Sequence, residues 1–193
     1  MTNKIKNNGF TLIETLVAVL LLSLAIAGPL SIASKGLSAT LVAKDQFIAF
    51  YLAQDAMEFV RSARDSNSLS GGDWLAGSTD LTTHCISTDG LTKACRIDSI
   101  QGTVPPCGNA QCNLSTPVAS SDVLYYDAMN HYFTYSHSAT TITPQKFFRR
   151  VAIKYDSSVN PDEAVVTVTV SWTDIAGVTH KPITVREIIF RWQ

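Results

Sequence analysis

The strongest pattern along the chain is a run of twenty residues without a charge, from Thr15 to Ser34 (TLVAVLLLSLAIAGPLSIAS). As an α-helix, such a run spans about 30 Å, the thickness of the hydrocarbon core of a bilayer. A buried core helix is normally shorter and has a polar stripe, and the apolar part of a cleaved secretory signal runs only about 7–15 residues. The run therefore favours a membrane-spanning helix over these two alternatives. Lys4 and Lys6 precede it, which predicts a cytoplasmic N-terminus and an exported remainder.

The helical pattern continues beyond the apolar run. From Gly36 to about Arg64 the apolar positions thin to one stripe with steps of three, four and seven, the helical period. Its members are Leu37, Leu41, Ile48, Leu52, Ala56, Phe59 and Ala63. The sequence predicts one helix of about 50 residues with an amphipathic second half and room for a kink at Gly28-Pro29.

The C-terminal third alternates with a period of two. In Val165–Trp172, valines and a tryptophan face one way while threonines and a serine face the other, which predicts a half-buried strand. Further strands are predicted at Val151–Tyr155, Val123–Tyr126, His131–Ser136 and Ile183–Trp192. The apolar phase of the last strand changes near Arg186-Glu187, which fits either a β-bulge or a strand end buried on both faces. The fold class expected is α+β: a long helix packed on an antiparallel sheet of four to five strands.

The segment 65–122 has no lasting periodicity and contains all four cysteines, Cys85, Cys95, Cys107 and Cys112. Their spacing, C-x9-C-x11-C-x4-C, matches no zinc pattern. An exported segment meets an oxidising environment, so disulfides are favoured over a metal site or free thiols. Four cysteines allow three pairings, and the two short loops, 85–95 and 107–112, close most easily.

Composition and charge exclude several classes of protein. Hydrophobic residues make up 46% and charged residues 16% of the 193, against about 25% charged in an average soluble domain. The net charge of −1 produces no overall attraction to nucleic acid. The four histidines are scattered and no catalytic motif is found, so we expect no enzyme, cofactor or metal. Lys146, Arg149 and Arg150 near the aromatic cluster at 125–135 give only thin support for a nucleic-acid or adhesive surface.

Glu14 interrupts the start of the apolar segment. A carboxylate deep in a bilayer costs about 2.5–3.5 kcal/mol on insertion scales, and less near the interface. Glu14 is therefore either an interfacial residue that snorkels into the headgroups or a carboxylate that pairs with a cation in the membrane plane.

The stretch Gly9-Phe10-Thr11-Leu12-Ile13-Glu14, after a short basic leader and before an apolar helix, resembles the prepilin signal of type IV pilins and type II secretion pseudopilins. The resemblance covers residues 1–35. It implies cleavage after Gly9 by a membrane aspartic peptidase, methylation of the new amine on Phe10, and a role for Glu14 in joining subunits. Two positions depart from the family pattern: Asn8 stands where a basic residue is frequent, and Pro29 lies slightly early.

The later segments FFRRVAIKY and VTVTVSWTD are loosely similar to minor pilins of the PilV class and to I-class pseudopilins. The resemblance implies a structural subunit of a type IV pilus or secretion-like filament. Its partners would be other pilin subunits, the prepilin peptidase, an inner-membrane assembly platform and membrane lipid. It would reside in the bacterial cytoplasmic membrane and then on the pilus or cell surface. Two alternatives remain: a membrane-anchored binding module, and a pilin specialised for DNA uptake or adhesion.

These expectations divide the chain into a leader (1–9), a membrane helix (10–35) and an exported pilin domain (36–193). Within that domain we expect an amphipathic helix (36–64), a disulfide-stapled loop region (65–122) and an antiparallel sheet (123–193).

Overall fold

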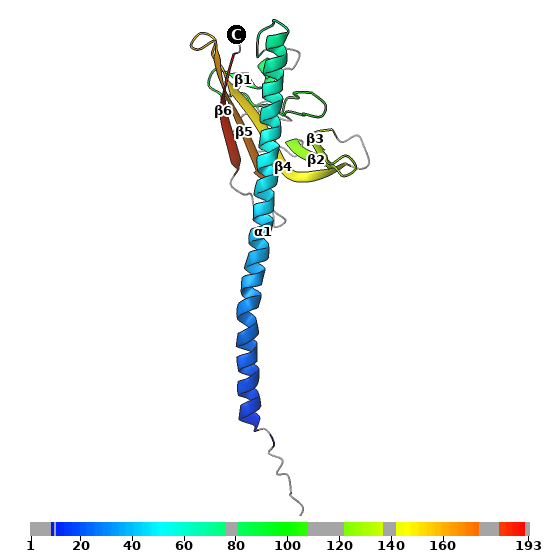
Figure 1. Cartoon of the computed structure of the whole chain (residues 1–193), viewed down its shortest axis with the longest axis vertical. Helices are drawn as coiled ribbons and strands as arrows, with labels where there is room; N and C mark the ends of the chain where they lie inside the picture. The colour runs from blue at the N-terminus through cyan, green and yellow to red at the C-terminus, as the bar shows by residue number, and fades with distance from the viewer. Residues whose placement is uncertain are drawn as a thin grey trace, which may run out of the picture. The chain divides into compact units, whose positions relative to one another are not determined.

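The computed structural model describes residues 9, 11–75, 81–107, 122–136, 142–173 and 182–191. The chain divides into two compact units, Met1–Asp45 and Gln46–Gln193, and the first helix runs through the boundary (Figure 1). The helices are α1 (Leu12–Leu69) and α2 (Leu81–His84). The strands are β1 (Ile86–Ser87), β2 (Val123–Asp127), β3 (Tyr132–Thr134), β4 (Ile142–Lys154), β5 (Glu163–Trp172) and β6 (Ile183–Phe190).

Helix α1 is longer than predicted and continues through Pro29. Within the second unit it buries one face of small and aliphatic side chains spaced by three, four and seven, which is the stripe that covers a sheet. Ala49, Leu52, Ala53, Ala56, Met57, Val60 and Ala63 are buried there. The predicted end near Arg64 was wrong because Asn67 is also buried, and its side-chain amide donates to the carbonyl of Trp74 (3.3 Å), which holds one more turn of helix in place.

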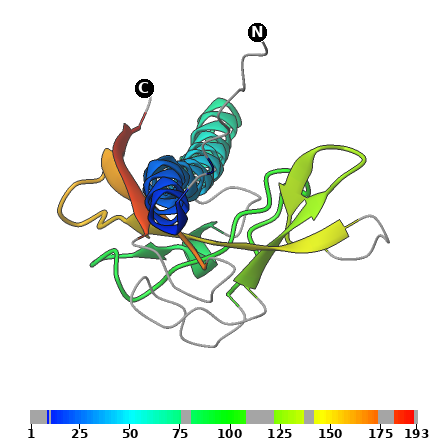
Figure 2. The same cartoon turned by 90° about the horizontal axis from the view of Figure 1, so that it is seen from below.

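The sheet has the order β3-β2-β4-β5-β6, with every neighbouring pair antiparallel. Figure 2 shows β2 and β3 at one end of the curled sheet and β5 and β6 at the other. Strand β5 alternates as predicted: Val166, Val168, Val170 and Trp172 are buried, and the residues between them are half-buried. The α+β fold class is therefore confirmed, and five of the six strands of the sheet form the antiparallel arrangement that the sequence predicts.

Strand β4 is much longer than the predicted Val151–Tyr155, and its second half is buried on both faces. Its first half pairs with β2, while its second half meets two short pieces on the same edge. β1 pairs in parallel with it through Ile86 and Ile153, and Cys95 bridges Val151. This parallel addition was not predicted, because two residues are too few to show a period.

Strand β6 pairs with β5 one residue to one, from Glu163 opposite Phe190 to Val170 opposite Ile183, without a shift in register. The predicted bulge near Arg186-Glu187 was therefore wrong. The other explanation, a strand end buried on both faces, was wrong as well, because Phe190 is exposed. The apolar phase changes since this edge strand has large apolar side chains on its exposed face.

A tight turn joins β2 to β3. The carboxylate of Asp127 accepts hydrogen bonds from the side-chain amide of Asn130 (2.8 Å) and from the backbone N–H of Met129 (2.9 Å). These bonds hold the pKa of Asp127 below its usual range, with the Asn130 bond contributing most. His131 completes the turn with a φ of 57°, in the left-handed region that non-glycine residues seldom occupy.

Candidate anchoring and assembly sites

The N-terminal end of α1 is capped by Thr11. Its carbonyl accepts from the backbone N–H groups of Glu14 (3.1 Å) and Thr15 (3.3 Å), and its hydroxyl lies 3.4 Å from the Glu14 nitrogen. A threonine followed three residues later by a glutamate is a capping-box pattern, which fixes where a helix begins. Glu14 therefore lies in the first turn, where the helix dipole favours a negative charge.

The first unit exposes an apolar surface along the whole of its helix. The exposed large side chains include Leu12, Ile13, Leu16, Val17, Val19, Leu20, Leu21, Leu22, Leu24, Ile26, Leu30 and Ile32. By length and composition this part of α1 can cross a membrane, and none of its most apolar window is buried. An apolar surface of this size is not stable in water, so it requires lipid or other apolar helices around it.

Glu14 is exposed within this surface. Gly9 precedes the helix without regular structure, and Phe10 lies outside the described residues. The helix therefore presents one carboxylate close to the predicted cleavage point. In an apolar medium, such a group is stabilised by a cation and strongly disfavoured without one.

Cys85 and Cys95 form a disulfide with their Cα atoms 4.9 Å apart, and both residues are fully buried. The Cys85 carbonyl accepts from the N–H of Ile153 (2.9 Å), and Cys95 exchanges two backbone hydrogen bonds with Val151. The disulfide thus fastens both pieces that line the edge of β4. Cys107 is also disulfide-bonded, whereas Cys112 lies outside the described residues.

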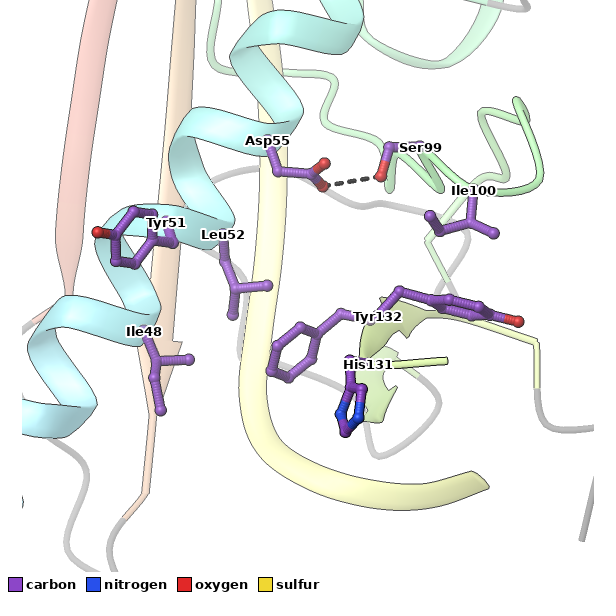
Figure 3. A pocket seen from close by; sticks show the side chains of 9 residues that line it. Ile48, Tyr51, Leu52, Asp55, Ser99, Ile100, His131 and Tyr132 are labelled. Atoms are coloured by element: carbon purple, nitrogen blue, oxygen red, sulfur yellow. Dashed lines mark hydrogen bonds between the residues drawn. The ribbon is translucent and has the colours of Figure 1, made fainter. Parts of the chain in front are cut away.

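The second unit contains a groove of about 320 Å³ between α1 and the β2–β3 hairpin. Figure 3 shows Ile48, Tyr51 and Leu52 on α1, Ile100 on the loop after β1, and His131 and Tyr132 on the hairpin. The lining is mostly apolar and aromatic, which suits the packing of a side chain better than chemistry on a substrate.

Among the described residues that line this groove, the one carboxylate, Asp55, already has hydrogen-bond partners. Asp55 accepts hydrogen bonds from the hydroxyl of Ser99 (2.9 Å, Figure 3) and from Nη1 of Arg149 (2.5 Å). His131 accepts from, or donates to, the Tyr126 hydroxyl through Nδ1 (2.9 Å). Among the described residues, no group of three or more His, Cys, Asp or Glu side chains is arranged to hold a metal ion.

Two of the three basic residues near the aromatic cluster, Arg149 and Arg150, are buried. Arg149 is 1% exposed; its Nη1 also donates to the carbonyl of Leu52 (2.8 Å), and Nη2 donates to that of Ile97 (2.5 Å). Arg150 is 5% exposed and lies 3.4 Å from Asp122. Neither side chain is free to contact a phosphate, so these two residues withdraw the thin support that the sequence offered for a nucleic-acid surface.

Sequence reasoning missed Arg149 as a structural centre. It joins α1, the loop before Ser99 and β4, and its own carbonyl accepts from the hydroxyl of Tyr135 (2.9 Å). Burial raises the pKa of that hydroxyl, so it stays protonated and donates over the ordinary pH range. The sequence did contain a signal for this role: two adjacent arginines stand between apolar residues of a strand. Arginines in that position are seldom solvated and need buried partners.

Comparison with protein families finds a match to the prokaryotic N-terminal methylation motif, over residues 4–28. No curated protein and no solved structure matches the chain. The matched stretch ends inside the exposed apolar part of α1 and includes Gly9 and Glu14. The chain therefore carries a type IV pilin-like prepilin signal.

Proposed function

We propose that this chain is a structural and assembly subunit, a minor pilin or a pseudopilin, of a filament of the type IV pilus or type II secretion kind. One observation carries the proposal: the methylation motif at residues 4–28 coincides with an exposed apolar helix that has a single carboxylate in its first turn. A plain membrane anchor needs neither a charge at that position nor the motif.

In this proposal a prepilin peptidase cleaves between Gly9 and Phe10, and the amine of Phe10 is then methylated. Lys4 and Lys6 keep the leader in the cytoplasm, where the peptide bond is presented at the membrane face. The second unit is exported, and its Cys85–Cys95 disulfide suits an oxidising compartment. A bulky residue in place of the glycine, as in Gly9→Leu, should leave the uncut chain in the membrane.

Glu14 then provides the contact between subunits. Cleavage creates a cationic amine on Phe10 at the same depth as the carboxylates of neighbouring chains. A unit charge pair at about 4 Å is worth roughly 1 kcal/mol in water and several times more at lower dielectric, so the pairing favours the assembled state. An assembly platform in the inner membrane would deliver subunits to this contact, and lipid would hold them beforehand.

The test is co-purification of the mature protein with sheared filaments or with partner subunits. Glu14→Ala and Glu14→Gln should be cleaved and inserted normally, because both changes remove a charge from the apolar segment, yet both should be lost from the filament fraction. Ser23→Ala is the matched control: it removes a polar side chain that bonds only to the helix carbonyl of Val19 (2.7 Å). Equal recovery of the Glu14 variants and the Ser23 control would refute the assembly role and leave the anchor standing.

A further inference from the structure

Strand β6 ends the sheet. Its eight residues pair with β5 on one side, and no described strand pairs with its other side (Figure 1). An edge of this length is a template for another strand, and proteins usually protect such edges with proline, a bulge or a short strand. β6 has no proline within its bounds and no shift in register against β5.

The hydrogen-bond phase shows which backbone groups face the open side. Arg191 N–H donates to the Asp162 carbonyl (2.9 Å), which makes these two residues, in line with the β5–β6 register, a hydrogen-bonded pair. Such pairs alternate along an antiparallel ladder. The residues of β6 that bond to β5 are therefore 183, 185, 187 and 189, and the residues that direct N–H and C=O groups to the open side are Thr184, Arg186, Ile188 and Phe190.

The β4–β5 ladder supports this phase independently. Thr173 N–H donates to the Lys146 carbonyl (3.4 Å), so the odd-numbered residues of β5 bond to β4 and the even-numbered residues remain for β6. The even-numbered residues of β5 stand opposite the odd-numbered residues of β6, as the β6 phase requires.

The same four residues have exposed side chains on one face of the sheet. Ile188 is 49% and Phe190 57% exposed, and each is a large apolar group beside unpaired backbone. Arg186 stands on this face two residues before Ile188, opposite Thr167 of β5, and forms no ion pair with a described residue. The edge thus combines directed hydrogen-bond groups, two apolar contacts and one available cation.

We propose that the open edge of β6 binds an extended segment of a partner protein by β-strand addition. The segment presents apolar side chains opposite Ile188 and Phe190 and a carboxylate opposite Arg186. Backbone hydrogen bonds supply affinity in this mode of recognition, and alternate side chains supply specificity. A second copy of β6 fits less well, because the four residues that face the open edge include no carboxylate to meet Arg186. The proposal does not depend on the pilin assignment.

The test uses the full chain in detergent and a labelled peptide, acetyl-Val-Thr-Val-Thr-Glu-Thr-Thr-amide, whose odd positions would stand opposite the four edge residues in antiparallel pairing. Binding is followed by fluorescence anisotropy. In the control peptide the glutamate is moved one position along, to the other face. We expect the first peptide to bind about two- to fivefold more tightly than the control, the range that one cross-strand charge pair supplies.

Three variants locate the site. Ile188→Pro removes an N–H that faces the open side, so the fold should persist while binding falls at least tenfold. Ile189→Pro removes an N–H that bonds to β5 together with a buried side chain, so it should destabilise the fold. Arg186→Glu should reject the glutamate peptide and bind a lysine counterpart.

Three results would overturn the proposal: no binding to the wild-type chain at about 1 mM peptide, undiminished binding to folded Ile188→Pro, or an Arg186→Glu variant with unchanged preference.

Discussion

Replacement of Arg149 by methionine should lower the free energy of unfolding by about 3 kcal/mol. The side chain is 1% exposed and donates to two carbonyls and one carboxylate. Methionine fills a similar volume but donates nothing, so the cost comes from the acceptors left behind.

The free-energy cost of losing the Arg149 hydrogen bond differs among the three acceptors. The carbonyl of Leu52 lies inside α1 and keeps its helical hydrogen bond. The side chain of Asp55 is 42% exposed, so it keeps its hydrogen bond from Ser99 and gains one from water, and its loss is small. The carbonyl of Ile97 belongs to a fully buried residue, and a buried acceptor without a partner costs about 1–3 kcal/mol. Loss of the charge-assisted bonds themselves supplies the remainder.

The assay is urea unfolding of the full chain in detergent, followed by tryptophan fluorescence, because Trp74 and Trp172 are buried in the second unit. Lys154→Met is the matched control: it makes the same kind of change at an exposed position of the same strand and should cost less than about 0.5 kcal/mol. If Arg149→Met and Lys154→Met unfold with equal free energies, the view that Arg149 holds α1 to the sheet is wrong.

Three further predictions concern the loops. Replacing both Cys85 and Cys95 by alanine should cost about 3 kcal/mol, since the disulfide closes a separation of ten residues, and the urea midpoint measures the loss. Asp127 has a lowered pKa in the folded state, so its ionised form stabilises the fold above the unfolded pKa of about 3.9 and loses this effect as pH falls through the folded value. The advantage of wild type over Asp127→Asn should therefore be present at neutral pH and shrink in acid; an advantage independent of pH would contradict the assignment. Gly90→Ala should destabilise more than Gly102→Ala in the same unfolding assay, because both have positive φ but only at Gly90 would a Cβ come within 2.7 Å of a neighbouring side chain.

Features with a sustained period were predictable from the sequence. The apolar run, the helical stripe and the alternation of Val166 to Trp172 each give many residues in one phase, so one misplaced residue does not hide the element. Four cysteines allow three sets of disulfide pairs, and the 85–95 pair, one of the two that short loops favoured, is present.

Features that depend on distant partners were not predictable. Arg149 and Arg150 interrupt the apolar pattern of β4, and the carboxylates that allow their burial, Asp55 and Asp122, lie 94 and 28 residues away in sequence. At the end of β6 the error was the reverse, because apolar residues there were expected to be buried and are exposed. Ile188 and Phe190 look like core residues in sequence, yet they lie on the exposed face of an edge strand.

Processing is decided by the mass of the N-terminal peptide of the mature chain, purified from cells that contain a prepilin peptidase. We expect a mature chain that begins at Phe10 and carries a methyl group on its amine. A mature chain that retains Gly9 and the residues before it, or one cut beyond the apolar run, would contradict the proposal that this protein is a processed pilin-like subunit.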